Sequence, residues 1–224
     1  MAEQVPFGST LVEIAQNPEP RCPCVLVLDV SGSMAGTPIA ALNAGLQDFQ
    51  SDLQSDSLAS QRVEVAVVSF GGRVETVGDF QTAHAFQPPT LVAGGETPMG
   101  EAVRSAIELV GQRKSIYKQA GLHYFRPWIV LITDGAPTDE WQSAAELVRQ
   151  GEAAKSFALF AVGVAGANFD TLRQLAVRDP LKLDGIKFRE FFLWLSQSQR
   201  SVSQSKPGEE GKVSLPSPTG WASL

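Results

Sequence analysis

Short apolar runs alternate along the chain with segments whose apolar residues recur at helical spacing. The first run, CVLVLDV, has no polar residue before Asp29, which is typical of a strand covered on both faces. The segment that follows Pro38 places Leu42, Leu46 and Phe49 on one face of a helix. Later runs, PWIVLITDG and FALFAVGV, are again separated by helical segments. This order predicts an α/β fold in which helices cover both faces of a mostly parallel sheet.

One pair of β-rich runs is joined in a different way. The runs RVEVAVVSF and RVETVGDF are separated only by Gly71-Gly72. A Gly-Gly pair between two such runs is typical of a β-hairpin turn. The sequence therefore predicts that one edge strand of the sheet is antiparallel to its neighbour.

The charge balance restricts the kinds of partner. The 224 residues include 18 Lys and Arg against 24 Asp and Glu, a formal net charge of −6. Non-specific nucleic-acid binding needs a basic surface, and an anionic membrane would repel this one. The N-terminal segment MAEQVPFGST lacks the basic and apolar regions of a secretory signal, and FALFAVGVAG is shorter than the ~20 residues of a membrane span. We therefore expect a cytoplasmic protein with neither a nucleic-acid nor a membrane partner.

The composition divides the chain into three parts. We expect an N-terminal arm over residues 1–22, one α/β domain over 23–198, and a Ser/Pro/Gly-rich tail over 199–224. The composition of the tail is typical of flexible chain. In contrast, Leu215 and Trp221 offer apolar side chains that would dock the tail on the domain.

Two cysteines, Cys22 and Cys24, precede the first apolar run. With one residue between them, a disulfide would be badly strained. A zinc site would need two further soft ligands, and the two histidines show no ligand spacing. We therefore expect plain thiols that enter a strand.

Oxygen-bearing side chains follow three of the expected elements. Asp29, Ser31 and Ser33 come at the end of the first strand, Thr97 precedes a helix in GGETPMG, and Asp134 ends PWIVLITDG. In a doubly wound sheet these positions meet at the carboxyl ends of neighbouring strands, where ligands bind. Carboxylate and hydroxyl oxygens select hard cations, Mg²⁺ above all, with Mn²⁺ or Ca²⁺ as alternatives. The set does not complete an octahedral shell, so at least one position would stay open.

Each element also has an ordinary structural explanation. Ser31 and Ser33 suit a turn, Thr97 before Pro98 suits a helix N-cap, and Asp134-Gly135 suits a turn. The joint occurrence of all three favours the metal site. By the same reasoning Asp139, with Gln142 three residues later, is interpreted as the N-cap of its own helix in a capping box.

The elements DVSGSM, ETPMG and ITDG together resemble the metal-ion-dependent adhesion site of von Willebrand factor A (vWA) domains. The wider segments PEPRCPCVLVLDVSGSM, GGETPMGEAV, YFRPWIVLITDGAPTDEW and FREFFLWLSQS are similar to bacterial proteins of the TerY/YegL type, which are associated with tellurite resistance and the response to chemical stress. The resemblance implies a Rossmann-like, doubly wound sheet of six strands with one antiparallel edge strand. It implies the metal ligands Asp29, Ser31, Ser33, Thr97 and Asp134. It also implies a signalling role beside a protein kinase and a PP2C-type phosphatase.

We expect a non-enzymatic, divalent-cation-dependent protein-interaction module whose partner supplies an acidic side chain to the metal. A second hypothesis is a metal-dependent phosphatase with Asp29 as the nucleophile. Such enzymes need a second acid two residues later, where this chain has Ser31, and a basic residue that the sequence does not place. A third hypothesis makes the Ser-rich tail a kinase substrate. A nucleotide-binding P-loop is excluded because no GxxxxGK[ST] occurs.

Overall fold

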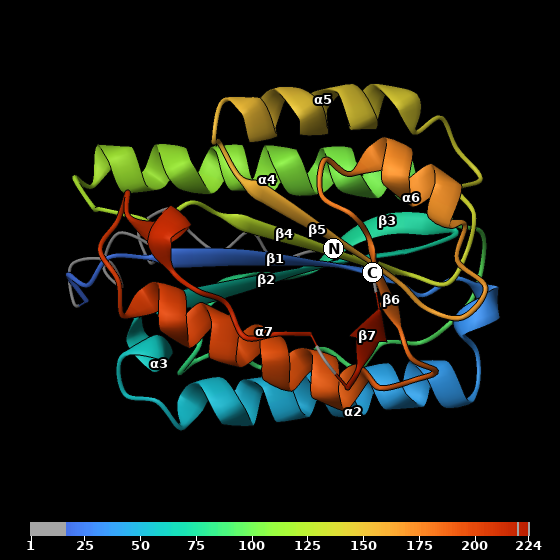
Figure 1. The fold of residues 1–224 in the computed structure, drawn as a ribbon, viewed down its shortest axis with the longest axis horizontal. Helices are drawn as coiled ribbons and strands as arrows, with labels where there is room; N and C mark the ends of the chain where they lie inside the picture. Colours follow the sequence, from blue (N-terminus) through green and yellow to red (C-terminus); the bar gives the residue numbers. More distant parts are fainter. Residues whose placement is uncertain (1–16, 219, 224) are drawn as a thin grey trace.

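The computed structural model describes residues 17–218 and 220–223. Within them one sheet has the strand order β3-β2-β1-β4-β5-β6-β7, with helices on both sides (Figure 1). The strands are β1 Cys22–Asp29, β2 Val63–Gly71, β3 Arg73–Thr82, β4 Trp128–Thr133, β5 Ala158–Gly163, β6 Leu181–Leu183 and β7 Ala222–Ser223. The helices are η1 Gly32–Met34, α2 Thr37–Gln54, α3 Ala59–Arg62, α4 Met99–Gln119, α5 Gln142–Ala153, α6 Phe169–Leu175, α7 Phe188–Ser203 and η2 Glu210–Lys212.

The predicted fold class is confirmed. Strands β1, β2, β4, β5 and β6 are parallel, and β3 returns antiparallel along β2 as the Gly71-Gly72 turn predicted. To these six strands the tail adds the two-residue strand β7, antiparallel to β6 at the opposite edge. The expected N-terminal arm lies mostly outside the described residues.

The apolar character of β1 follows from its central position. Cys24, Leu26 and Leu28 face one core with α2 and α7, whereas Val25 and Val27 face the other core with α4 and α5. Figure 1 shows these two helical layers, one above and one below the sheet. Because both faces are covered, alternate polar positions are absent from the strand. The strand order around β1 also reverses here, since β2 lies on one side of it and β4 on the other.

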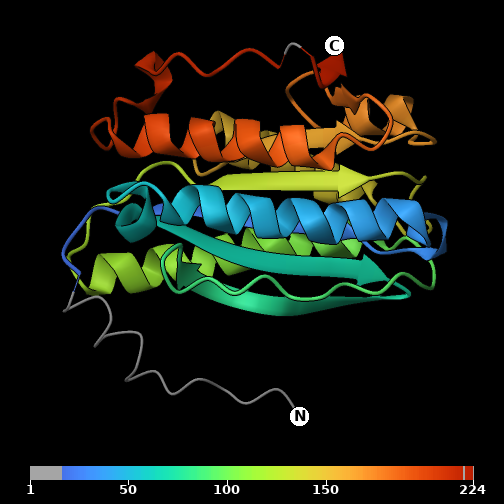
Figure 2. The same ribbon diagram turned by 90° about the horizontal axis from the view of Figure 1, so that it is seen from below.

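An extended segment, residues 83–98, returns the chain from the end of β3 to the carboxyl ends of the parallel strands (Figure 2). Side chains of α2 hold it. The Asn43 amide accepts a hydrogen bond from Leu91 N–H at 2.8 Å and donates one to Leu91 O at 2.9 Å. Gln50 Nε2 donates to Phe86 O at 2.5 Å. These contacts deliver Thr97 to the edge of the sheet where β1 and β4 end.

Helix α7 continues beyond Ser196, where the composition changes, to Ser203. Phe192 of α7 packs against Phe49 of α2, with ring centroids 5.6 Å apart, and the tail then folds back over α7 (Figure 2). Trp221 is buried, with its ring centroid 5.3 Å from those of Phe191 and Trp194. The Trp194 indole donates a 2.8 Å hydrogen bond to Pro216 O. The described part of the tail is therefore packed on the domain.

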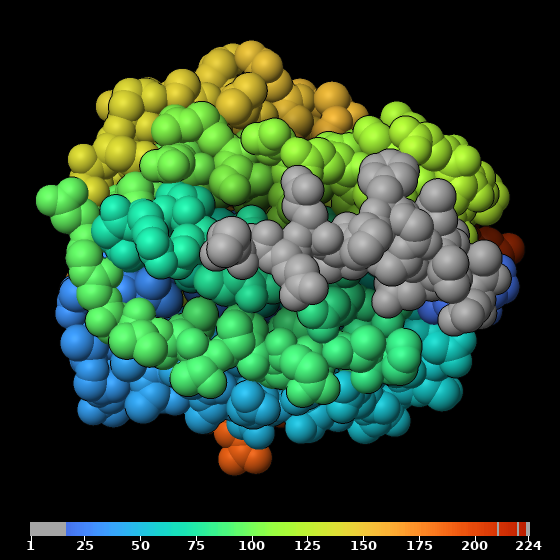
Figure 3. Space-filling view, turned by 180° about the vertical axis from the view of Figure 1, so that it is seen from behind, coloured from blue at the N-terminus to red at the C-terminus, as the bar shows by residue number. Residues whose placement is uncertain are grey.

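A buried ionic cluster joins the other end of the sheet to α4. Glu64 in β2 accepts hydrogen bonds from Arg21 Nε at 2.8 Å and from Arg113 Nε at 2.7 Å, and it also accepts one from the Tyr117 hydroxyl. All four side chains are buried. Pairing of this kind is needed because an unpaired buried carboxylate is costly. Figure 3 shows the face of the molecule on which β3 and the extended segment lie.

Candidate metal centre

Asp29 ends β1 with a fully buried side chain. Its Oδ1 accepts a 2.8 Å hydrogen bond from Ser31 N–H, and its Oδ2 accepts a 2.5 Å bond from the Thr133 hydroxyl. The second bond follows from the strand register, because Leu28 is paired with Ile132 and the next residues are Asp29 and Thr133. The two bonds fix the plane of the carboxylate.

Two serine hydroxyls connect this strand end to that of β4. Ser31 Oγ and Ser33 Oγ lie 3.0 Å apart, and Ser33 Oγ donates a 2.7 Å hydrogen bond to Asp134 Oδ1. Ser31 and Asp134 are buried, while Ser33 is exposed. The structure therefore places these three predicted residues in one hydrogen-bonded chain, with an opening to solvent at Ser33.

Thr97 is held beside this chain by its backbone. Its N–H donates to Thr138 Oγ1 at 3.1 Å, and Thr138 N–H donates to Thr97 O at 2.9 Å. The preceding glycines fix the approach of the loop: Gly32 N–H donates to Gly95 O at 3.0 Å. Gly95 has φ 80°, and a Cβ there would meet the Gly72 backbone at 2.5 Å, so a side chain is excluded on both counts.

Gly135 lies next to both Thr97 and Asp29. A Cβ built on Gly135 would lie 3.4 Å from Thr97 Oγ1 and 3.8 Å from Asp29 Oδ2. Both oxygens thus surround one small space that the missing side chain leaves open. Thr97 as a residue is 6% exposed, and its hydroxyl forms no hydrogen bond with the described residues, yet it is not among the fully buried polar atoms that lack a partner. The hydroxyl oxygen is therefore accessible, and a ligand in this space could bind it.

The electrostatics of the pocket favour a cation. Burial raises the pKa of Asp29, and the nearby charge of Asp134 adds to the rise, while hydrogen bonds from Ser31 and Thr133 oppose it. A raised pKa means that the ionised form is disfavoured in this environment. A bound cation would reverse that preference.

The donor set fits a hard divalent ion. It contains two carboxylates and three hydroxyls, and no imidazole or thiolate. In the part of the chain that the structure describes, no group of three or more His, Cys, Asp or Glu is arranged to hold a metal. Hydroxyls must therefore supply part of any coordination, which leaves at most two protein charges to balance the ion.

The capping explanation of Thr97 is wrong. Helix α4 begins at Met99, its N-cap is Pro98, and no side chain of that residue caps it. Asp139 caps α4 instead, because its Oδ1 and Oδ2 accept from Gly100 N–H at 2.9 Å and Glu101 N–H at 2.7 Å. The interpretation of Asp139 as the cap of its own helix is wrong for the same reason.

Two residues that support the site lie outside the sequence motifs that predicted it. Thr133 orients Asp29, and Thr138 anchors Thr97. A signal for Thr133 exists, since it directly precedes Asp134 at the end of the strand expected beside the first one. Thr138 lies in a loop with no comparable pattern.

The structure is a doubly wound α/β domain with polar side chains at the carboxyl edge of the sheet. The sequence profile of the von Willebrand factor type A domain matches residues 24–183. The chain therefore belongs to this family, a class of metal-dependent protein-interaction modules. No curated protein matches the sequence.

Solved structures show the same fold at low sequence identity. The pilus adhesin SpaC of Lactobacillus rhamnosus GG, in an open conformation, superimposes with a TM-score of 0.64 at 15% identity, over 82% of this chain and 31% of SpaC. Manganese-loaded TRAP protein of Plasmodium vivax gives 0.54 at 17% identity, over 77% of this chain and 73% of TRAP. Proximal thread matrix protein 1 of the mussel byssus, with a zinc-occupied MIDAS motif, gives 0.57 at 16%, over 80% and 48%. The chain thus spans less than half the length of the SpaC and byssus proteins.

Proposed function

We propose that this chain is a divalent-cation-dependent protein-interaction module. Its metal ligands would be Asp29, Ser31, Ser33, Thr97 and Asp134. The observation that carries the proposal is the convergence of oxygen atoms from three separate loops on one small space, where the Thr97 hydroxyl forms no hydrogen bond with the described residues.

The residues of the proposed site have different roles in binding the ion and the partner. A bound ion would supply positive charge and an open position for a carboxylate of the partner. Asp29 provides the oriented negative charge, since Ser31 N–H and the Thr133 hydroxyl hold its two oxygens. Ser33 lies at the exposed side of the site, where a partner would approach. Mg²⁺ is the first expectation for oxygen donors, with Mn²⁺ or Ca²⁺ as alternatives.

The partner is expected to be a protein that presents an exposed Asp or Glu. Because the chain carries a net charge of −6, long-range steering does not favour an acidic partner, so the contact must depend on the ion itself. Affinity capture from native lysate should yield partners in Mg²⁺ that are released by EDTA. Moderate salt should weaken the complex much less than chelation. Partners retained equally well in EDTA would refute the proposal.

The biological setting rests on the sequence resemblance. We propose a cytoplasmic role in bacterial stress signalling of the tellurite-resistance type, beside a protein kinase and a PP2C-type phosphatase. Mass spectrometry of the EDTA-released fraction tests this, because one of these enzymes should be enriched. Within the described residues, no helix is long and apolar enough to cross a bilayer.

The structure restricts the two alternative hypotheses, a kinase substrate and a phosphatase. In the tail over residues 199–224, Ser203 is buried in α7, as are Ser196 and Ser198 just before the tail, so a kinase would be restricted to exposed positions such as Ser214. For a phosphatase, the position two residues after Asp29 is Ser31, and no Lys or Arg among the described residues is paired with Asp29. An assay with an aryl phosphate and Mg²⁺ should show no turnover. Hydrolysis that disappears in an Asp29 variant would instead support the enzyme.

A further inference from the structure

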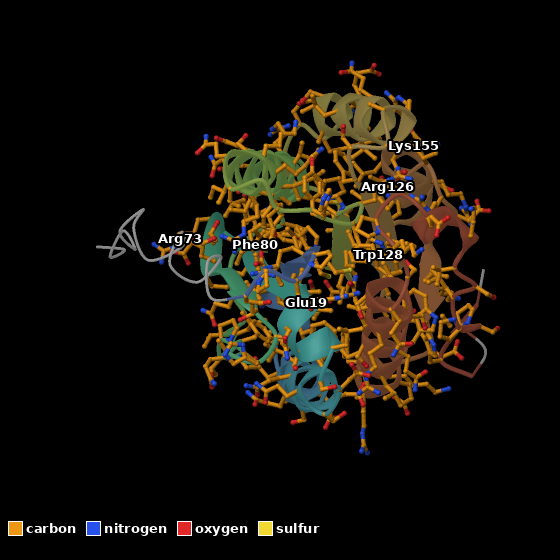
Figure 4. The ribbon with its side chains drawn as sticks, turned by 90° about the vertical axis from the view of Figure 1, so that its left-hand side faces the viewer. Glu19, Arg73, Phe80, Arg126, Trp128 and Lys155 are labelled. Carbon is orange, nitrogen blue, oxygen red and sulfur yellow. The ribbon has the colours of Figure 1, made fainter. Side chains whose placement is uncertain are left out.

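A cavity of about 690 Å³ lies at the end of the sheet opposite the candidate metal centre, where β4 and β5 begin. Trp128 and Phe160 form its floor, Val202 of α7 borders it, and Val213 and Leu215 of the tail cover one side. Figure 4 looks onto this end of the molecule, where Lys155, Arg126 and Trp128 follow one another from the end of α5 toward α7. The volume is within the range of about 300–1,000 Å³ found for small-ligand sites.

The charge around this cavity is opposite to that of the chain as a whole. Four cations line it, Lys114, Arg126, Lys155 and Arg178, and no acidic side chain is among the described residues that do so. Glu152 lies behind two of them, at 2.6 Å from Arg126 Nη2 and in contact with Arg178 Nη1. Glu152 therefore pairs with two of the four cations that line the cavity, in a protein whose acids outnumber its bases.

Two of the cations have no acidic partner. Neither Lys114 nor Lys155 forms an ion pair in the described part of the chain; Lys114 Nζ donates only to Ser156 O, at 3.2 Å. Burial and the neighbouring charge of Lys118 lower the pKa of Lys114. An anion in the cavity would relieve both effects.

The floor of the cavity is aromatic. The ring centroids of Trp128 and Phe160 are 4.5 Å apart, and the Arg178 guanidinium lies 5.1 Å from the Phe160 centroid. Tyr124 and Pro127 extend the same wall. An apolar floor with cations at its rim is complementary to a ligand that is apolar at one end and anionic at the other.

We propose that this cavity binds a small aromatic anion, whose ring packs against the Trp128–Phe160 floor and whose sulfonate, phosphate or carboxylate group contacts Lys155 and Lys114. The site is separate from the metal centre, and it does not depend on the proposed interaction function.

A fluorescent aromatic sulfonate, 8-anilinonaphthalene-1-sulfonate, is the probe. Titration of the full chain in EDTA excludes anion binding through a metal, and it should show saturable binding at one site per chain. Naphthalene-1-sulfonate should displace the probe. Inorganic sulfate has the anionic group without the ring, and neutral 1-naphthol has the ring without the charge, so each should displace the probe at least about tenfold more weakly.

Two variants test the assigned contacts. Lys155 has φ 52°, a conformation that Asn tolerates, so Lys155→Asn removes the charge without backbone strain. It should weaken binding of the probe about threefold to tenfold. Phe160→Leu keeps an apolar side chain but removes the ring, and it should weaken binding about threefold. Arg189→Gln is the control, because it changes the net charge equally at a highly exposed site on α7.

Thermal unfolding must first show that the variants are folded. Loss of affinity in Lys155→Asn and Phe160→Leu, with unchanged affinity in Arg189→Gln, supports the site. The proposal is overturned if the folded protein shows no saturable binding, if both variants bind like the parent chain, or if 1-naphthol competes as well as naphthalene-1-sulfonate. None of these outcomes bears on capture of a partner in Mg²⁺.

Discussion

The Thr133 hydroxyl donates a 2.5 Å hydrogen bond to Asp29 Oδ2 across the ends of two neighbouring parallel strands. Because Thr133 also accepts from Gly135 N–H at 3.2 Å, its hydroxyl proton is directed at the carboxylate. With Ser31 N–H on Oδ1, the carboxylate is oriented before any ligand arrives. Such orientation of a ligand by neighbouring groups is a general feature of metal sites.

Asp29→Asn should abolish Mg²⁺ binding while leaving the fold intact. The amide keeps the shape of the side chain and removes a buried charge that lies near Asp134. It also loses one of the two accepted hydrogen bonds, so the two effects oppose each other and stability in EDTA should change by less than about 1 kcal/mol. Calorimetric titration and thermal unfolding on the same preparation check both parts. Unchanged Mg²⁺ affinity in the folded variant would show that Asp29 is not a ligand.

Thr133→Val should weaken Mg²⁺ binding without removing a ligand of the metal. The shape is conserved, but Asp29 Oδ2 loses its donor, so Mg²⁺ affinity should fall about tenfold or more. Stability should fall by about 1–2 kcal/mol, because two hydrogen-bonding groups lose their partner. Titration with Mg²⁺ and urea unfolding measure the two effects, and an affinity equal to that of the parent chain would contradict the orienting role.

Gly135→Ala should fill the space between the oxygen donors. The new methyl group would lie 3.4 Å from Thr97 Oγ1 and 3.8 Å from Asp29 Oδ2, at ordinary contact distance. Because these contacts are not compressed, stability in EDTA should change by less than about 0.5 kcal/mol. The increase in melting temperature that Mg²⁺ gives the parent chain should be lost. A full increase would place the ion elsewhere.

Thr97→Val and Asp139→Ala should separate metal binding from helix capping. Thr97→Val removes only the hydroxyl, so it should impair Mg²⁺ binding and leave stability in EDTA nearly unchanged. Asp139→Ala removes the acceptor for two N–H groups of α4, so it should cost about 1 kcal/mol while the folded protein still binds Mg²⁺. The reverse pattern in calorimetry and thermal unfolding would return Thr97 to a structural role.

Cys24 should be unreactive in the folded protein and should make stability depend on alkaline pH. Burial raises the pKa of this thiol from 9.0 to about 12. Above pH 9 the unfolded chain loses the thiol proton and the folded chain keeps it, so the free energy of unfolding should decrease as the pH rises from 9 toward 12. Urea unfolding of the parent chain and of Cys24→Ala measures the difference. Rapid labelling of Cys24 at pH 8 in the native state would contradict its burial.

The fold could be predicted because its signals are local. The uninterrupted run of β1, the helical spacing of Leu42, Leu46 and Phe49, and the Gly71-Gly72 turn each act within one element. The meeting of Asp29, Ser33 and Asp134 could be anticipated because strand ends in a doubly wound sheet share an edge.

Contacts between distant segments could not be predicted in the same way. Asp139 caps a helix that begins forty residues earlier, and nothing in its neighbours distinguishes that helix from its own. Glu64 lies inside an apolar run, which indicates a buried partner, but its partners Arg21 and Arg113 are fixed only by packing. The short strand β7 has two residues, too few for a periodic pattern.

The packing of α7 and the tail defines the smallest fragment worth expressing. The family match ends at residue 183, yet Phe188, Phe192 and Trp194 belong to the main core. A fragment cut at that boundary would expose the apolar surface of the sheet and of α2 that α7 covers. It would also lose β7, so the edge of β6 would be free to pair with another chain. The folding unit therefore extends to the C-terminal strand, and fragments trimmed to the family boundaries should aggregate.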